Sequence, residues 1–393
     1  MSQPSHLFSP LTLRSVTLKN RVVIAPLCMY SSVGGFASDW HLSHLGGFAR
    51  GGAALVFTEA TAVEPAGRIT HGCCGLWSDA QIEPLKGITR HIERLGAVPG
   101  IQLAHAGRKA SVSRPWEGSA PLTAVHAAAG EPPWPVVGPC AEAVGPGWPT
   151  PDALDEAGIA RIVAAFAASA RRALAAGFRV LEVHGAHGYL VHSFLSPLAN
   201  HRNDGYGGDR AGRMRFALEV ARAVREVWPS NLPLFFRISA VDGPAGGWSL
   251  DDSVALASEL AACGVDVVDC SAGGISGPPH FRADDGGKPL PKGGERLPGF
   301  QVPYAERLRR DAGVKTMAVG VIIDPHQAEA IVSDGRADLT AIGREAIYNP
   351  YWALHASQAL GVDPEHKLWP DPYGWAVRRR AEIREGLKKI GYA

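Results

Sequence analysis

Residues 152–189 read DALDEAGIARIVAAFAASARRALAAGFRVLEVHGAHGY, and this stretch decides the fold. Its first part predicts a helix over 152–176 that Gly177 ends, because apolar residues recur on one face at helical spacing. Those residues are Ile159, Ile162, Val163, Phe166, Ala170 and Leu174. The helix leads directly into a strand-length apolar run, RVLEVH at 179–184.

The same kind of unit recurs along the chain. Further apolar runs of strand length lie at 21–26, 53–59, 97–103, 233–239, 265–271, 314–320 and 338–343. Amphipathic segments predicted as helices lie at 209–227, 250–263, 304–311 and 325–333. Nearly continuous apolar strands that alternate with helices are typical of a parallel sheet covered on both faces. The pattern therefore predicts an α/β protein, a single (β/α)8 TIM barrel over residues 1–393.

Three connections that follow strands are long: 104–150, 185–208 and 272–299. In this type of barrel, the segments after the strands form the catalytic face. Long ordered segments at this position predict a lid or a substrate channel.

Composition excludes several classes of protein. The 39 Lys and Arg residues balance 38 Asp and Glu residues, so we expect no nucleic-acid partner and no binding to an anionic membrane surface. No apolar run is long enough to span a membrane, and the N-terminus has no export signal. The six cysteines contain no Cys-x-x-Cys pair, which argues against zinc ribbons and most iron–sulfur clusters. We therefore expect reduced thiols and a cytoplasmic location.

Polar side chains stand at the carboxyl ends of the predicted strands. Gln102, His184, Arg237 and Arg344 all occupy such positions. Buried charge is costly unless it is paired or used, and active sites of barrels form at this end. Glycines at 320 and 343 end the last two strands, where barrels often bind a phosphate group.

The motif at 184–189, HGAHGY, admits three interpretations. His184 and His187 are candidate metal ligands, but no HExxH helix accompanies them. They are also candidates for a structural role, satisfied by loop carbonyls. The third interpretation is a pair of donors for an anionic or carbonyl oxygen. Tyr189 would then be a proton donor, since a phenol remains protonated at neutral pH.

Taken together, the motifs resemble the old yellow enzyme family of flavin-dependent ene-reductases. The resemblance covers almost the whole chain and is carried by IQLAHAGRKA at 101–110, by HGAHGYLVHSFLSPLANHRNDGYGG at 184–208, by LFFRIS at 234–239 and by GRE at 343–345. Cys28 and Tyr30, in APLCMY, resemble the thermophilic-like subgroup that includes xenobiotic reductases.

The resemblance implies a non-covalent FMN that is reduced by NADPH, or in some members by NADH. An α,β-unsaturated carbonyl or another activated alkene then enters the same space, which gives ping-pong kinetics. Carried over by motif, the residues that bind the cofactor are Ala25, Pro26, Leu27, Cys28, Ala60, Gln102, Arg237, Gly320, Gly343 and Arg344.

The resemblance also implies the catalytic roles. His184 and His187 hold the substrate oxygen, Tyr189 protonates the α-carbon, and Tyr30 adds a contact on the substrate side. Cys28 approaches the reactive edge of the flavin and tunes its potential. Val319 departs from some xenobiotic reductases, which have Trp at this place, and this difference predicts a roomier pocket.

The C-terminal extension, 361–393, resembles a segment that often reaches the active site of a neighbouring subunit. The resemblance implies a homo-oligomer, a dimer or a tetramer, in which Trp375 or Arg378–Arg380 make this contact. The alternative is a solvated end of a helix. The alternative function is a catalytically silent flavin-binding or redox-sensing barrel, which would lack the histidine pair or Tyr189.

Overall fold

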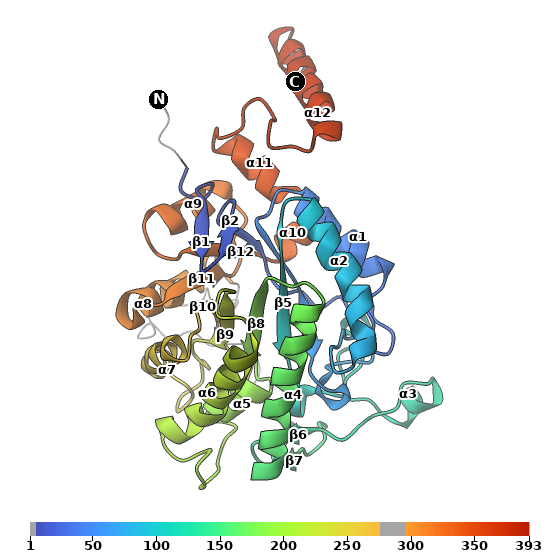
Figure 1. Cartoon of the computed structure of the whole chain (residues 1–393), viewed down its shortest axis with the longest axis vertical. Coiled ribbons are helices and arrows are strands. Elements are labelled where there is room, and N and C mark those ends of the chain that lie inside the picture. Colours follow the sequence, from blue (N-terminus) through green and yellow to red (C-terminus); the bar gives the residue numbers. More distant parts are fainter. Residues whose placement is uncertain (1–4, 276–295, 393) are drawn as a thin grey trace.

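The computed structural model describes residues 5–275 and 296–392, and its centre is a closed barrel of eight parallel strands. Around the barrel, the hydrogen-bonded order is β10-β11-β12-β3-β4-β5-β8-β9 (Figure 1). Their bounds are β3 Val22–Ile24, β4 Leu55–Ala62, β5 Val98–Ala104, β8 Val180–Gly185, β9 Leu234–Ser239, β10 Val267–Ser271, β11 Lys315–Val319 and β12 Leu339–Ile342. Each lies at one of the predicted apolar runs, so the prediction of a TIM barrel is confirmed.

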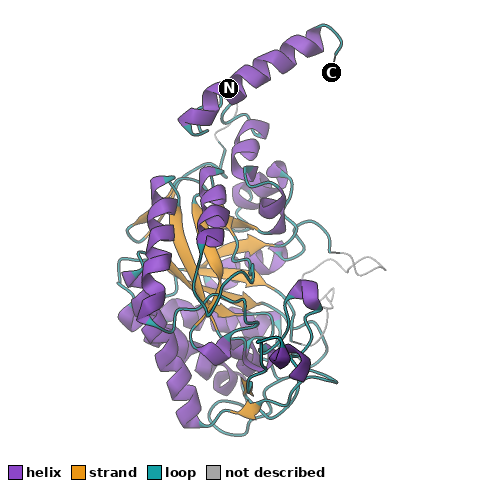
Figure 2. Cartoon of the chain, turned by 90° about the vertical axis from the view of Figure 1, so that its right-hand side faces the viewer, coloured by secondary structure: helices purple, strands orange, loops and turns teal. Residues whose placement is uncertain are grey.

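Helices surround the barrel and shield its outer face (Figures 1 and 2). The α-helices of the described residues are α1 Asp39–Arg50, α2 Ile82–Arg94, α3 Ala124–Ala128, α4 Glu156–Ala175, α5 Leu190–Leu195, α6 Arg210–Val227, α7 Leu250–Ala262, α8 Val302–Ala312, α9 Pro325–Ser333, α10 Arg344–Tyr348, α11 Trp352–Ala359 and α12 Asp371–Lys389. Of these, α3 and α12 stand away from the barrel (Figure 1). No helix in the described part of the chain has the length and apolar character needed to cross a membrane.

Helix α4 shows where the sequence prediction was right and where it was wrong. The helix begins at Glu156 rather than Asp152, because the Asp155 side chain caps it by accepting a hydrogen bond from the Gly158 N–H at 2.7 Å. Asp152 instead pairs with Val137 in a short two-stranded sheet, formed by β6 Val137–Gly138 and β7 Asp152–Ala153. Leu174 was wrongly placed on the buried face and is 38% exposed.

The segments after the strands build the carboxyl-terminal face of the barrel. The connection 104–150 contains three short helices, η3 Gly107–Lys109, η4 Pro115–Glu117 and α3, before it reaches β6. The connection 185–208 contains α5, whose six residues are all buried. Most of the predicted loop 272–299 lies outside the described residues. At the opposite end, the hairpin of β1 Leu11–Leu13 and β2 Val16–Leu18 was not predicted.

Helix α12 projects away from the barrel, at the end of the molecule opposite β6 and β7 (Figures 1 and 2). Gly374 is its one buried residue. At its base, Tyr351 and Trp369 stack with ring centroids 5.5 Å apart, and Arg50 lies 5.6 Å from the Tyr373 ring. The helix therefore adds little to the barrel core.

We expect that deletion of residues 371–393 leaves the barrel folded. Because α12 buries almost no apolar surface against the barrel, the melting temperature should fall by no more than about 4 °C, the equivalent of roughly 1–2 kcal/mol. Differential scanning calorimetry and circular dichroism of the truncated and full-length chains measure this change. Loss of the cooperative transition would show that α12 is part of the folding unit.

Candidate functional site

A cavity of about 610 Å³ opens at the carboxyl ends of the strands. Its volume lies within the range of pockets that hold small molecules and cofactors. Eight of the predicted site residues line it: Ala25, Pro26, Leu27, His187, Arg237, Gly320, Gly343 and Arg344. Residues from the first strand, the middle of the chain and the last two strands therefore meet at one place, as the barrel topology requires.

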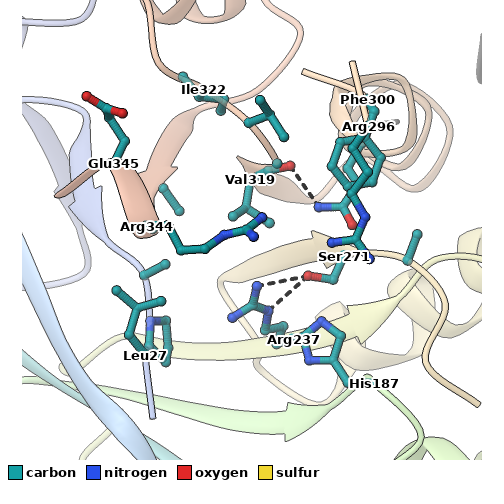
Figure 3. A pocket seen from close by; sticks show the side chains of 18 of the residues that line it. Leu27, His187, Arg237, Ser271, Arg296, Phe300, Val319, Ile322, Arg344 and Glu345 are labelled. Carbon is teal, nitrogen blue, oxygen red and sulfur yellow. Dashed lines mark hydrogen bonds between the residues drawn. The ribbon is translucent and has the colours of Figure 1, made fainter. Parts of the chain in front are cut away.

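The cavity is rich in positive charge. Figure 3 shows Arg344 extending into the space, with Arg237 and His187 along one wall and Leu27 on another. Arg296 also lines the cavity, beside Phe300. Guanidinium groups with glycine backbone nearby form a setting for a phosphate group.

The backbone conformation at position 320 and the close packing around it require a glycine. Its φ of +121° lies in the region that side chains rarely adopt, and a Cβ atom would approach Phe300 Cε1 to 2.8 Å. A side chain at position 320 would therefore distort the wall that Phe300 and Gln301 form.

The two histidines form a chain of hydrogen bonds that leads into the cavity. His184 Nδ1 accepts from the Ala186 N–H at 3.3 Å, so the neutral ring carries its proton on Nε2. His184 Nε2 then donates to His187 Nδ1 at 3.4 Å, which leaves the proton of His187 on Nε2. Of the pair, His187 lines the cavity and His184 lies buried behind it.

Burial and charge keep both imidazoles neutral. Desolvation is the main cause that lowers the pKa of His184 and His187 well below the usual value, and the Arg237 charge adds to it. A neutral imidazole with a fixed tautomer is a hydrogen-bond donor that does not itself carry charge. The pair can therefore stabilise negative charge that develops on an oxygen atom.

The backbone of His187 is strained and firmly held. Its φ of +60° lies in the left-handed region. The N–H of His187 donates to Ser239 Oγ at 2.9 Å, and Lys109 Nζ donates to the His187 carbonyl at 2.8 Å. Lys109 Nζ also donates to the Gly274 carbonyl at 2.9 Å, which joins this loop to the segment after β10.

A buried hydrogen-bonded pair, His192 and Asp242, holds the backbone of Gly188. The Gly188 N–H donates to His192 Nδ1 at 2.8 Å, and His192 Nε2 donates to Asp242 Oδ1 at 2.8 Å. Asp242 also accepts from Ser196 Oγ and the Trp248 N–H, at 2.6 and 2.7 Å. Although burial opposes it, the hydrogen bonds that Asp242 accepts from His192, Ser196 and the Trp248 N–H hold its pKa below the usual value. The aspartate therefore remains ionised and fixes the His192 tautomer.

Tyr189 is the N-cap residue of α5 and does not line the main cavity. Its ring centroid is 5.1 Å from that of His184, in an edge-to-face arrangement. Together with Ala60, Arg68 and Cys73, it lines a second cavity of about 10 Å³. Burial, reinforced by Cys28, raises the pKa of Tyr189, so the phenol keeps its proton.

Cys28 and Tyr30 lie in the segment after β3. The Met29 N–H between them donates to Glu59 Oε2 at 3.3 Å, and Glu59 Oε1 accepts from His41 Nε2 at 3.1 Å. Burial, and then the Glu59 charge, raises the pKa of the Cys28 thiol well above its usual value. Cys28 is therefore a neutral thiol, and it does not line the main cavity.

Gln102 lies in the barrel interior and does not line the main cavity. Its Nε2 donates to Glu182 Oε1 at 2.7 Å. This contact points the amide nitrogen toward Glu182, so the amide oxygen is the atom that remains for another donor.

Sequence reasoning missed several residues at the site. Lys109 lies in the motif 101–110, and Ser271 ends β10, so both were accessible to the rule that strand ends carry function. Arg296 lies inside the long connection 272–299 and Phe300 directly follows it, so neither stands at a strand end. Within residues 5–275 and 296–392, no group of three or more His, Cys, Asp or Glu side chains is placed to hold a metal ion.

Comparisons with known proteins identify the family of this chain. The model of the family described as "NADH:flavin oxidoreductase / NADH oxidase family" matches residues 6–362. An NADPH dehydrogenase of Geobacillus thermodenitrificans is 42% identical over 361 residues, 91% of this chain and 96% of that protein. Morphinone reductase has a TM-score of 0.73 at 27% identity, with 90% of each chain covered.

A third likeness concerns the fold alone. The structure of 2-naphthoyl-CoA reductase with 2-naphthoyl-CoA has a TM-score of 0.77 at 22% identity. The match covers 92% of this chain and 53% of that one, so this chain spans about half of that protein.

Lys109 gives a prediction about pH. Burial lowers the pKa of Lys109 from 10.5 to about 8, and the neighbouring Arg108 adds to the effect. Between these values the unfolded chain binds the proton and the folded chain has released it, so this group makes the free energy of unfolding rise with pH. The upper limit of this contribution is roughly 3 kcal/mol.

We expect Lys109→Met to remove this rise. The measurement is denaturant unfolding of the wild type and the variant from pH 7 to pH 10.5, which yields the difference in unfolding free energy at each pH. At pH 7 the variant also leaves two carbonyls without their donor, at about 1–3 kcal/mol each if they remain dry. A difference that does not change with pH would contradict the assignment.

Proposed function

The chain belongs to the NADH:flavin oxidoreductase / NADH oxidase family, which includes the old yellow enzymes, and on this premise we propose that it is an FMN-dependent ene-reductase. NADPH, or alternatively NADH, is the hydride donor, and α,β-unsaturated carbonyls or related activated alkenes are the acceptors. The observation that carries the proposal is a cationic cavity lined by neutral His187, which is hydrogen-bonded to neutral His184, with the protonated Tyr189 ring packed 5.1 Å from that of His184.

The residues of the cavity fit FMN. Arg344 and Gly343, with Gly320 opposite, would hold the phosphate, and Arg237 would face the ring system. Ala25, Pro26 and Leu27 supply an apolar wall for a flat aromatic group. Ala60, Gln102 and Cys28 are proposed as further contacts. When bound, FMN supplies hydride transfer from NAD(P)H to the alkene.

The histidines are proposed to bind the carbonyl oxygen of the substrate. In this arrangement, His187 Nε2–H is the direct donor and His184 fixes its tautomer. Negative charge that grows on the oxygen is stabilised by donors that are already oriented, since the loop of His187 is held by Ser239 and Lys109. The loss of one such donor typically costs on the order of 3 kcal/mol of transition-state stabilisation.

Tyr189 is proposed to deliver the proton to the α-carbon, with Tyr30 as a further contact with the substrate. Because the pKa of Tyr189 is raised by burial, the phenol is fully protonated before the reaction. The presence of both histidines and Tyr189 argues against a silent flavin-binding barrel.

We also propose that the C-terminal extension contacts a second subunit in a homo-oligomer. Three apolar side chains on or next to α12 are exposed: Trp375 at 65%, Ile383 at 56% and Ile390 at 72%. A group of exposed apolar side chains is typical of a surface that contacts another protein. The basic run Arg378–Arg380 lies on the same helix. Sedimentation velocity of the chain without residues 371–393 tests whether the assembly depends on α12.

The central experiment measures both the bound cofactor and the turnover of an alkene. We expect purified protein to be yellow and to release FMN on heat denaturation. Anaerobic NADPH should bleach the flavin, and addition of 2-cyclohexenone should restore its absorbance with formation of cyclohexanone. A colourless protein that does not take up added FMN would contradict the proposal, as would bleaching that no activated alkene reverses.

Replacement of Tyr189 by Phe separates the two half-reactions. We expect slower reduction of the alkene by about 10²–10⁴-fold, the usual contribution of a general acid, with unchanged flavin reduction by NADPH. Stopped-flow absorbance measures each step. Tyr206→Phe is the matched control, because Tyr206 is a buried tyrosine whose hydroxyl donates to Glu219. Equal slowing of both steps would assign Tyr189 a role in flavin or ligand binding instead.

A further inference from the structure

Beneath the cavity, the barrel interior holds two carboxylates and one guanidinium. Glu182 on β8 and Asp269 on β10 are 0% exposed, and Arg237 on β9 between them is 7% exposed. Arg237 Nε lies 3.0 Å from Asp269 Oδ2. Arg237 Nε and Nη2 also donate to Ser271 Oγ, at 3.1 and 2.9 Å.

The charges of Glu182, Asp269 and Arg237 do not sum to zero if both acids are ionised. Two buried negative charges would then face one positive charge in a region without solvent, and an unpaired buried charge is strongly unfavourable. Glu182 Oε2 and both carboxylate oxygens of Asp269 are buried and have no hydrogen-bond partner among the described residues. Buried atoms of this kind require an explanation. The ion pair with Arg237 accounts for the ionised form of Asp269, and a proton on Glu182 would remove the second buried negative charge.

The contacts distinguish the two acids. Asp269 lies against the Arg237 guanidinium, which favours its ionised form. Among the described residues, Glu182 makes one hydrogen bond, with the Gln102 amide at 2.7 Å, and it has no ion-pair contact. Burial, and then the Asp269 charge, raises the pKa of Glu182 well above its usual value, whereas the pKa of Asp269 rises to about 6.

We propose that Glu182 is a neutral carboxylic acid at neutral pH and that Asp269 alone balances Arg237, so that the barrel interior carries one proton and no net charge. Glu182 is then a positioning residue: it orients the Gln102 amide without cancelling the Arg237 charge at the cavity wall. The consequence for bound FMN rests on the proposed function, because a cation near the flavin sets its midpoint potential.

Infrared difference spectroscopy tests the proton directly and needs no cofactor. Wild-type protein near pH 7 should show the C=O stretch of a protonated carboxylic acid, and Glu182→Gln should lack it. Asp269→Asn should lack it too, because Glu182 then becomes the ionised partner of Arg237. Asp242→Asn is the control that keeps the band, since Asp242 is buried and ionised.

Absence of the band in the wild type would overturn the proposal without any variant. Its survival at full intensity in Glu182→Gln would also overturn it, since the proton would then lie elsewhere. Because Gln has the size and charge of a protonated Glu, this variant is expected to fold, and calorimetry verifies that it does. These results stand whether or not the protein binds FMN, so they do not depend on the proposed function.

The midpoint potential of bound FMN supplies the second readout. We expect Glu182→Gln to leave the potential unchanged, because a neutral group replaces a neutral group. The double variant Glu182→Gln, Asp269→Asn leaves Arg237 without an anion and should shift the potential to a more positive value. A positive shift in the single variant Glu182→Gln would show that Glu182 is ionised, and would reject the proposal.

Discussion

The buried guanidinium of Arg237 is the constraint on which the site depends. It lies inside the barrel, where charge requires a partner, and Asp269 and Ser271 supply contacts from the adjacent strand. Its charge acts on two parts of the site, the loop after β8 and the cavity. Toward the loop after β8, it helps to keep His184 and His187 neutral, and toward the cavity it provides a fixed positive wall. One side chain therefore contributes both to the neutral state of the two imidazoles and to the positive charge of the cavity wall.

A neutral imidazole stabilises charge on a substrate oxygen only if its orientation is fixed. Several hydrogen bonds therefore hold the backbone around His187. The left-handed φ of His187 costs about 1–3 kcal/mol, so the surroundings must over-determine it. Ser239, Lys109 and His192 each bond the backbone of residues 187 and 188 from a different element. The His192–Asp242 pair is part of this support because the ionised carboxylate fixes which imidazole nitrogen can accept.

The fold could be predicted almost completely from the sequence, because a strand that is buried on both faces consists almost entirely of apolar residues and is recognisable as a continuous apolar run. All eight barrel strands lie at such runs. The ends of helices were less certain, since the cap at Asp155 depends on one side-chain contact that competes with the sheet pairing of Asp152. Much of the site also followed from the sequence, since eight predicted residues line one cavity, but the internal order did not. Nothing in HGAHGY shows that His187 reaches the cavity while His184 lies behind it.

The interior charges show why the rest was inaccessible to sequence reasoning. Glu182 lies within an apolar strand, between Leu181 and Val183, and Asp269 lies between Val268 and Cys270. A pattern of single residues indicates that both are buried, but charge balance is a property of groups that come from different strands. Arg237 and Asp269 are opposed in the β9–β10 register, and Gln102 and Glu182 in the β5–β8 register. The pairing of β5, β8, β9 and β10 as neighbours brings these two pairs into one barrel interior, where the acids outnumber the cation and a bound proton restores the balance of charge.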